Sequence, residues 1–301
     1  MRLCTLLGIN ILIILCLSGC SLFPADSSQK RNTEQTEASV NEARGTSYQD
    51  EQTSVSDENE PHQPGTKVDL STSSEDPEEN TQYNEDESSS DHILTGKIIC
   101  VDPGHGVTSE TKQELMSPKS RETKAAYVSG ASGEYQTEEE LNLAVAKLVK
   151  NKLEALGAEV IMTRTKHDVA VSNIERAEIA NDANADICIR IHADGTENSS
   201  ANGFSILVPS GDLLGNPSII EPSREAAEAV ETSLSESTGA RDRGIVERED
   251  LTGFNWSEVP VILVEMGFLS NSEEDEKMST DSYREKLAEG ISNGIEKWLT
   301  E

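Results

Sequence analysis

The sequence has 301 residues, of which 56 are Asp or Glu and 25 are Lys or Arg, and its formal net charge at pH 7 is −31. Phosphate binding needs clustered Lys and Arg, so this charge argues against a nucleic acid as partner. We attribute the acidity to solubility rather than to the binding of calcium or a cationic ligand.

The first twenty residues have the pattern of a secretory signal peptide. A positive charge at Arg2 precedes an apolar run at 5–17, which is shorter than the about 20 residues that span a membrane. The run ends in Leu-Ser-Gly-Cys at Cys20, which resembles the bacterial lipobox, in which the cysteine carries lipid such as palmitate. We expect residues 1–19 to be a lipoprotein signal peptide and the exported protein to be anchored to the cell membrane through Cys20, facing the wall. A plain signal peptide with an incidental cysteine is the alternative.

Residues 20–95 are rich in Ser, Thr, Glu, Asp, Gln and Asn and have almost no large apolar side chains. Such a segment buries too little surface to offset the entropy of ordering, so we expect a disordered acidic tether. Residues 96–301 have the size of one globular domain, which we expect to be a monomer. Its cysteines, Cys100 and Cys188, lie in apolar runs, which leaves buried thiols and a disulfide as alternatives.

The first half of this domain alternates strand and helix. We expect a strand at 97–102, a long polar loop at 107–136, a helix at 137–156, a strand at 158–163 and a helix from 172 to about 184. Capping boxes formed by Thr137 with Glu140 and by Ser172 with Glu175 mark the two helix starts. Gly157 ends the first helix.

The second half continues the alternation. We expect strands at 186–192, 204–208 and 259–266, a helix at 224–238, and a last helix that carries Tyr283, Leu287, Ile291, Ile295 and Trp298 at helical spacing. Strands that alternate with helices of crossover length predict an α/β fold, with a mostly parallel twisted sheet of about six strands and helices on both faces.

Four polar side chains fall where this fold places ligands, beyond the carboxyl ends of the strands. His105 follows the first strand, His192 ends the strand at 186–192, and Glu265 lies near the end of the strand at 259–266. Glu138 is the first helical residue after the long loop. It shares the apolar face of its helix, so its carboxylate is expected to point toward the sheet and to need a partner such as a metal ion.

Two histidines and one carboxylate form a known catalytic zinc set. His105, Glu138 and His192 fit the ligands, and Glu265 fits a second carboxylate that takes a proton from water and passes it to a leaving amine. Singly, each has a structural alternative: His105 in a polar turn, His192 as a half-buried histidine, Glu138 at the helix dipole and Glu265 paired with Arg190. All four alternatives would have to coincide, which favours the zinc site.

Four segments resemble, in the same order, the zinc-dependent N-acetylmuramoyl-L-alanine amidases of bacterial cell walls with a single α/β catalytic domain. They are Val101-Asp-Pro-Gly-His-Gly106, Glu138-Glu-Glu-Leu-Asn-Leu143, Ile191-His-Ala-Asp194 and Val264-Glu-Met-Gly-Phe-Leu-Ser-Asn271. The resemblance covers essentially all of residues 96–301. One departure is Val107, where some relatives have a second glycine.

The resemblance implies an enzyme that hydrolyses the amide between N-acetylmuramic acid and L-alanine in peptidoglycan. In that family His105, Glu138 and His192 would hold Zn²⁺, and Glu265 would act as general base and then as general acid. We expect the loop at 107–136 to shape the peptide side of the groove.

Some assignments stay open at this point. Three acidic neighbours of Glu138 are alternative metal ligands, namely Glu134, Glu139 and Glu140. Asp102 and Arg190 are expected to contact the metal ligands without binding the metal themselves. Another zinc hydrolase of the wall, such as a peptidase or a deacetylase, and a non-catalytic wall-binding lipoprotein are the competing functions. The presence of Glu265 favours an enzyme.

Overall fold

The computed structural model describes residues 92–301. The predicted signal peptide at 1–19, the lipidation site Cys20 and nearly all of the predicted tether at 20–95 lie outside the described residues. The packed chain begins before the predicted boundary at 96, because Leu94 is buried and its backbone amide donates to the carbonyl of Leu156. Within 92–301, no helix combines the length and the apolar character needed to cross a membrane.

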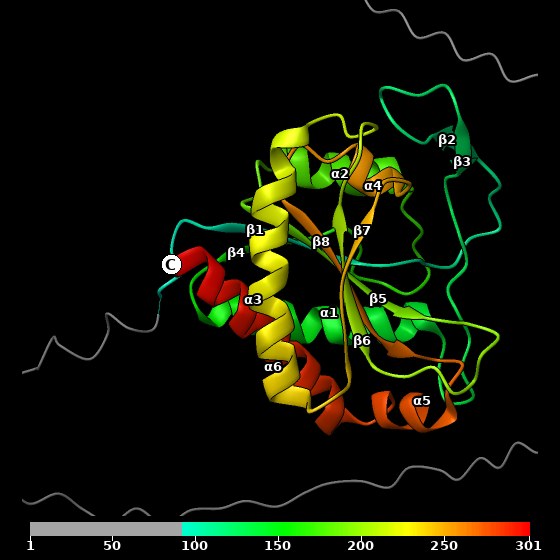
Figure 1. The fold of residues 1–301 in the computed structure, drawn as a ribbon, viewed down its shortest axis with the longest axis vertical. Helices are drawn as coiled ribbons and strands as arrows, with labels where there is room; N and C mark the ends of the chain where they lie inside the picture. The colour runs from blue at the N-terminus through cyan, green and yellow to red at the C-terminus, as the bar shows by residue number, and fades with distance from the viewer. Residues whose placement is uncertain (1–91) are drawn as a thin grey trace, which may run out of the picture. The chain divides into compact units, whose positions relative to one another are not determined.

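A six-stranded sheet forms the centre of the domain (Figure 1). Its strands, in spatial order, are β4 (Glu159–Met162), β1 (Ile98–Pro103), β5 (Ile187–Asp194), β8 (Val261–Phe268), β6 (Phe204–Pro209) and β7 (Asp242–Arg248). Neighbouring strands are parallel except β6 and β8, which run antiparallel. The predicted α/β class and the mostly parallel sheet are therefore confirmed.

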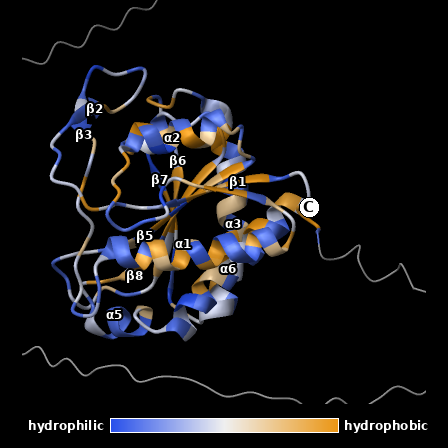
Figure 2. Ribbon diagram, turned by 180° about the vertical axis from the view of Figure 1, so that it is seen from behind, coloured by the Kyte–Doolittle hydropathy of each residue, from blue (hydrophilic) through white to orange (hydrophobic). Residues whose placement is uncertain are grey.

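Helices cover both faces of this sheet. One face packs against α1 (Glu138–Ala155), α3 (Ile220–Thr238) and α6 (Asp281–Thr300), and the other packs against α2 (Asn173–Asp182) and α4 (Thr252–Asn255). A single turn of 3₁₀ helix at 217–219 precedes α3, and α5 (Ser272–Met278) follows β8. The apolar residues concentrate on the strands and on the inner sides of the helices (Figure 2).

Side-chain alternation divides each central strand between two cores. On β5, Ile187, Ile189 and Ile191 lie in the larger core under α1, α3 and α6, whereas Cys188 lies in the smaller core under α2 and α4. Cys188 is the register partner of Cys100 on β1, and both are buried free thiols. The same alternation places His192 at the carboxyl end of β5 on the α2 side.

The helix starts follow the local sequence signals. Capping boxes at Thr137 and Ser172 begin α1 and α2, as predicted. The helix α3 ends where Gly239 takes a left-handed conformation with φ of 62°, which glycine adopts without steric cost. Because Thr137 fixes the first turn of α1, it also fixes where Glu138 lies.

The region predicted as a loop at 107–136 contains a short hairpin of β2 (Gln113–Leu115) and β3 (Thr123–Ala125). Contacts with distant segments hold it in place. The Glu114 carboxylate accepts a hydrogen bond from the amide of Ile174 at the start of α2, and the Asn255 side chain donates to the carbonyl of Met116. Trp256 donates from Nε1 to the carbonyl of Leu115. The hairpin is therefore a fixed wall of the domain.

Further elements differ from the sequence prediction. No element was expected in the segments that form the strand β7, the helices α4 and α5 and the 3₁₀ turn at 217–219. Most side chains of β7 are exposed or half-buried, since it lies at the edge of the sheet. An edge strand of this kind lacks the apolar period that marks a buried strand.

Candidate metal centre

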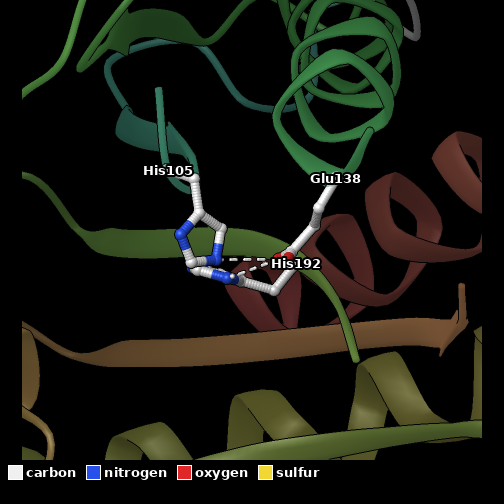
Figure 3. Close-up of side chains that lie close together, drawn as sticks. All are labelled: His105, Glu138 and His192. Atoms are coloured by element: carbon white, nitrogen blue, oxygen red, sulfur yellow. Dashed lines mark hydrogen bonds and ion pairs between the residues drawn. The ribbon is translucent and has the colours of Figure 1, made fainter. Parts of the chain in front are cut away.

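Three predicted residues from distant parts of the chain meet at the carboxyl edge of the sheet (Figure 3). His105 follows β1, Glu138 opens α1 and His192 lies near the end of β5. Oε1 of Glu138 is 3.0 Å from Nε2 of His105 and 3.1 Å from Nδ1 of His192. One ligand atom from each residue lies within 4.8 Å of the others, so this group can hold a metal ion.

The His105 ring is positioned by an unusual turn. His105 has a φ of 59°, in the left-handed region that few residues other than glycine occupy. The preceding Gly104 leaves room for the second histidine, because a Cβ there would lie 2.2 Å from Cε1 of His192. Nδ1 of His105 lies 2.7 Å from the carbonyl oxygen of Val128. If Nδ1 carries the proton and donates to that carbonyl, Nε2 is left facing the group.

Glu138 is buried within a set of hydrogen-bond donors. Its Oε2 accepts from the amide of Ala131 at 2.8 Å, and its Oε1 accepts from Nδ2 of Asn142 and from the amide of Ala193, both at 3.2 Å. Burial raises the pKa of the Glu138 carboxyl, but the contacts with the two histidines outweigh burial and hold its pKa well below its usual range. The carboxylate is therefore ionised.

The other acidic residues near Glu138 do not join the histidines. Glu140 accepts instead from the amide and hydroxyl of Thr137 in the capping box. Glu134, Glu139 and Glu140 are absent from the three-residue group found among residues 92–301. The geometry thus singles out Glu138.

The two imidazoles differ in their environment. Burial lowers the pKa of His192 to about 4, so its ring is neutral at neutral pH. Its Nε2 is buried and has no hydrogen-bond partner among the described residues. Burial also lowers the pKa of His105, but the contact with Glu138 outweighs burial and leaves that pKa raised. Buried polar atoms normally have partners, so the lone Nε2 fits a ligand atom.

Glu265 lies beside this group on the neighbouring strand. It is the register partner of His192, and its Oε2 is buried without a hydrogen-bond partner in the described part of the chain. Burial raises the pKa of the Glu265 carboxyl well above its usual value, and the negative charges of Glu138 and Asp194 add to the rise. The alternative pairing with Arg190 is not found, because Nε of Arg190 donates to Asp102.

Asp102 forms a buried ionic cluster behind the histidines. It is fully buried, and it accepts hydrogen bonds from Arg176 at 2.5 Å, from Arg190 at 2.8 Å and from the hydroxyl of Thr163 at 2.5 Å. Burial raises the pKa of Asp102, but the two arginines outweigh burial and hold its pKa well below its usual range. Asp102 and Arg190, the two residues that the sequence analysis expected next to the metal ligands, are thus paired with each other.

Two arginines that the sequence analysis did not single out hold the turn that carries His105. Arg176 donates to the carbonyls of Pro103 at 2.8 Å and His105 at 2.6 Å. Arg164 donates to the carbonyls of Pro103 at 3.0 Å and Gly104 at 2.8 Å. No local pattern marks either arginine, because the carbonyls of this turn lie at least 60 residues before them in the sequence.

Asn142 is a further residue that the sequence analysis missed. It donates to Glu138 from the next turn of α1, and it also lies 3.4 Å from the carbonyl of Gly104. A polar residue four positions after Glu138 on the same buried helix face is a signal that could have identified it.

The fold and this group define an α/β domain with a candidate catalytic metal centre at the carboxyl edge of its sheet. The family described as N-acetylmuramoyl-L-alanine amidase matches residues 99–297, which is more than half of the chain. The chain belongs to this family, and the resemblance in its motifs is confirmed.

Individual relatives agree with this assignment. The chain is 31% identical over 201 residues to the N-acetylmuramoyl-L-alanine amidase LytC of Bacillus subtilis (strain 168), covering 67% of this chain and 35% of LytC. It is also 31% identical over 205 residues to the uncharacterized protein YqiI of the same strain, covering 68% of this chain and 86% of YqiI. The chain thus spans about a third of the length of LytC.

Solved structures give the same result. The crystal structure of the apo form of the N-acetylmuramyl-L-alanine amidase Ami1 from Mycobacterium abscessus matches with a TM-score of 0.63 and 27% identity. The match covers 68% of this chain and all of that chain.

The buried ionic cluster predicts the effect of Asp102→Asn. This change leaves Arg176 and Arg190 buried without their counter-ion, so we expect the free energy of unfolding to fall by roughly 3–5 kcal/mol. Urea denaturation measures it. The control is Glu285→Gln, which removes an exposed pair with Lys152 and should cost less than about 1 kcal/mol. Equal losses in the two variants would contradict the account of the cluster.

The same cluster predicts a pH dependence. The pKa of Asp102 is depressed in the folded protein and about 3.9 in the unfolded chain, so the unfolded chain binds more protons at low pH. Its stabilisation is complete only above about pH 5 and is lost progressively as the pH falls below that value toward the folded-state pKa. The difference in unfolding free energy between wild type and Asp102→Asn should therefore shrink between pH 5 and pH 3, as urea titrations at several pH values can measure. A constant difference would contradict the linkage.

Proposed function

We propose that this protein is a zinc-dependent N-acetylmuramoyl-L-alanine amidase that hydrolyses the amide bond between N-acetylmuramic acid and L-alanine in peptidoglycan. Membership of the amidase family over nearly the whole described domain carries the proposal. The His-Glu-His group and Glu265 supply the side chains that such a hydrolysis needs.

We propose that His105, Glu138 and His192 hold Zn²⁺. Two imidazoles and one carboxylate are a catalytic zinc set that leaves a position open for water and substrate. The neutral ring of His192, its unpartnered Nε2 and the ionised Glu138 all suit a cation. When bound, zinc polarises a carbonyl oxygen and lowers the pKa of a water molecule that it binds.

The proposed role of Glu265 is to carry the proton. It takes a proton from the attacking water as the new bond from oxygen to the lactyl carbonyl carbon forms. It then gives that proton to the alanine nitrogen as the amide bond breaks, which leaves a free amine and a lactyl carboxylate. The position of Glu265 next to His192 on the adjacent strand supports this role.

The proposal extends to the whole chain. It comprises a lipoprotein signal peptide at 1–19, a lipidated Cys20 followed by a tether, and a monomeric catalytic domain at 96–301 onto which the residues just before it, such as Leu94, also pack. The Leu-Ser-Gly-Cys sequence and a substrate that lies in the cell wall support an exported protein anchored to the membrane.

The metal assignment predicts the zinc content of the purified protein. We expect about one zinc per chain in the wild type, since the three side chains form one site, and almost none in the His105→Ala, His192→Ala double variant. Elemental analysis by mass spectrometry measures it. His92→Ala changes an exposed histidine outside the group and serves as the control. A wild-type protein without stoichiometric metal, or a double variant that retains it, would refute the site.

The catalytic assignment predicts the effect of Glu265→Gln. The variant should keep its zinc and lose at least about a hundredfold in rate, because general acid and base transfer is removed. Mass spectrometry of digested sacculi follows the reaction: an amidase releases peptides with a free alanine amine and an intact glycan, whereas a deacetylase releases acetate. Glu247→Gln, which changes an exposed glutamate of β7, is the control. An active Glu265→Gln protein would overturn this mechanism.

A further inference from the structure

A groove of about 630 Å³ runs beside the metal centre and includes Glu265 in its lining. Its floor is apolar: Leu263 lies two positions before Glu265 on the same face of β8, and Leu207 is its register partner on β6. The β2–β3 hairpin and the end of β7 with the residues after it also line the groove. Each of these two segments contributes a cation, Lys124 and Arg248.

The two cations are fixed by one anion. Arg248 donates from Nε and Nη2 to the two carboxylate oxygens of Asp250, at 2.9 and 3.1 Å, and Nζ of Lys124 lies 3.3 Å from the same carboxylate. Two cations share one anion, so the cluster has one positive charge in excess. A guanidinium has five N–H donors, and the described residues engage two of those of Arg248. Donors therefore remain for a second carboxylate.

A smaller groove of about 310 Å³ also has Val128 in its lining, and its chemistry differs. The hydroxyl groups of Thr108, Ser109 and Thr111 line it together with the carboxylates of Glu110 and Glu139. Among its described lining residues there is no Lys or Arg. This side suits an uncharged sugar and repels an acidic peptide, whereas the Arg248 side attracts one.

We propose that Arg248, assisted by Lys124, binds a carboxylate of the stem peptide, so that the peptide lies in the groove beside Glu265 and the glycan lies toward Val128. The inference rests on the proposed amidase function, whose substrate carries an acidic residue after alanine. The apolar floor of Leu207 and Leu263 receives the alanine methyl between Glu265 and the cations. Arginine binds carboxylates through paired hydrogen bonds, and Asp250 holds this arginine ready to do so.

The test compares two substrates that differ only in charge. One is N-acetylmuramoyl-L-alanyl-D-glutamate with both carboxyl groups free, and the other is the same molecule with both as carboxamides. The zinc-loaded full chain should cleave the diacid with at least about tenfold higher kcat/KM than the diamide. In Arg248→Gln the diacid value should fall to that of the diamide, whereas the diamide value should stay within about twofold. Lys124→Gln should give a smaller change of the same sign.

The matched control is Arg243→Gln, which removes an exposed arginine from the same strand outside the groove and should keep the diacid preference. Equal cleavage of both substrates by the wild type overturns the inference and leaves the amidase proposal intact. An equal loss on both substrates in Arg248→Gln also overturns it, since that pattern means an effect on Glu265. If neither substrate is cleaved, the amidase proposal fails. Calorimetric binding of the two compounds to Glu265→Gln then decides the carboxylate site: preference for the diacid supports it, and equal or no binding overturns it.

Discussion

The ion pairs of the buried Asp102 with Arg176 and Arg190 are the interaction on which the site depends. Three charged groups without water are stable only if each is paired, so neither arginine can leave its place at low cost. The remaining donors of Arg176 hold the carbonyls of the turn after β1. That turn places His105 in a left-handed conformation, which persists only where the surroundings over-determine it. The cluster thus fixes the position of His105, one side chain of the candidate metal group, relative to the sheet.

The parts of the fold that the sequence predicts are those with a strong local signal. The capping box at Thr137 locates the start of α1 to the residue, and the apolar face of that helix then turns Glu138 inward. The alternation on β5 assigns His192 to the face opposite the three isoleucines. Because parallel strands end at a common edge of the sheet, these local signals are enough to predict that the side chains lie close together.

The parts that the sequence does not predict depend on contacts between distant segments. The β2–β3 hairpin has strands of three residues, too short for any period, and Asn255 and Trp256 fix it from far along the chain. Lys124 and Asp250 are 126 residues apart, so no spacing rule links them. The walls of the groove are therefore set by tertiary structure, while its floor follows from the strand pattern of β8. For that reason the residues that line the groove are harder to predict from the sequence than the residues of the candidate metal group.

Glu138 is a buried residue, whereas Glu265 is half-buried with one buried carboxylate oxygen, and the surroundings of the two carboxylates differ. Glu138 accepts two amide hydrogen bonds and contacts both histidines, so its negative charge is strongly stabilised and its pKa is lowered. Glu265 lies on an apolar strand with an unpartnered oxygen, and burial raises its pKa. Two acids whose environments move their pKa values apart are suited to different tasks, one to hold a cation and one to exchange a proton. The amides that donate to Glu138 belong to Ala131, in the segment before α1, and to Ala193 on β5, so contacts between distant segments set this contrast.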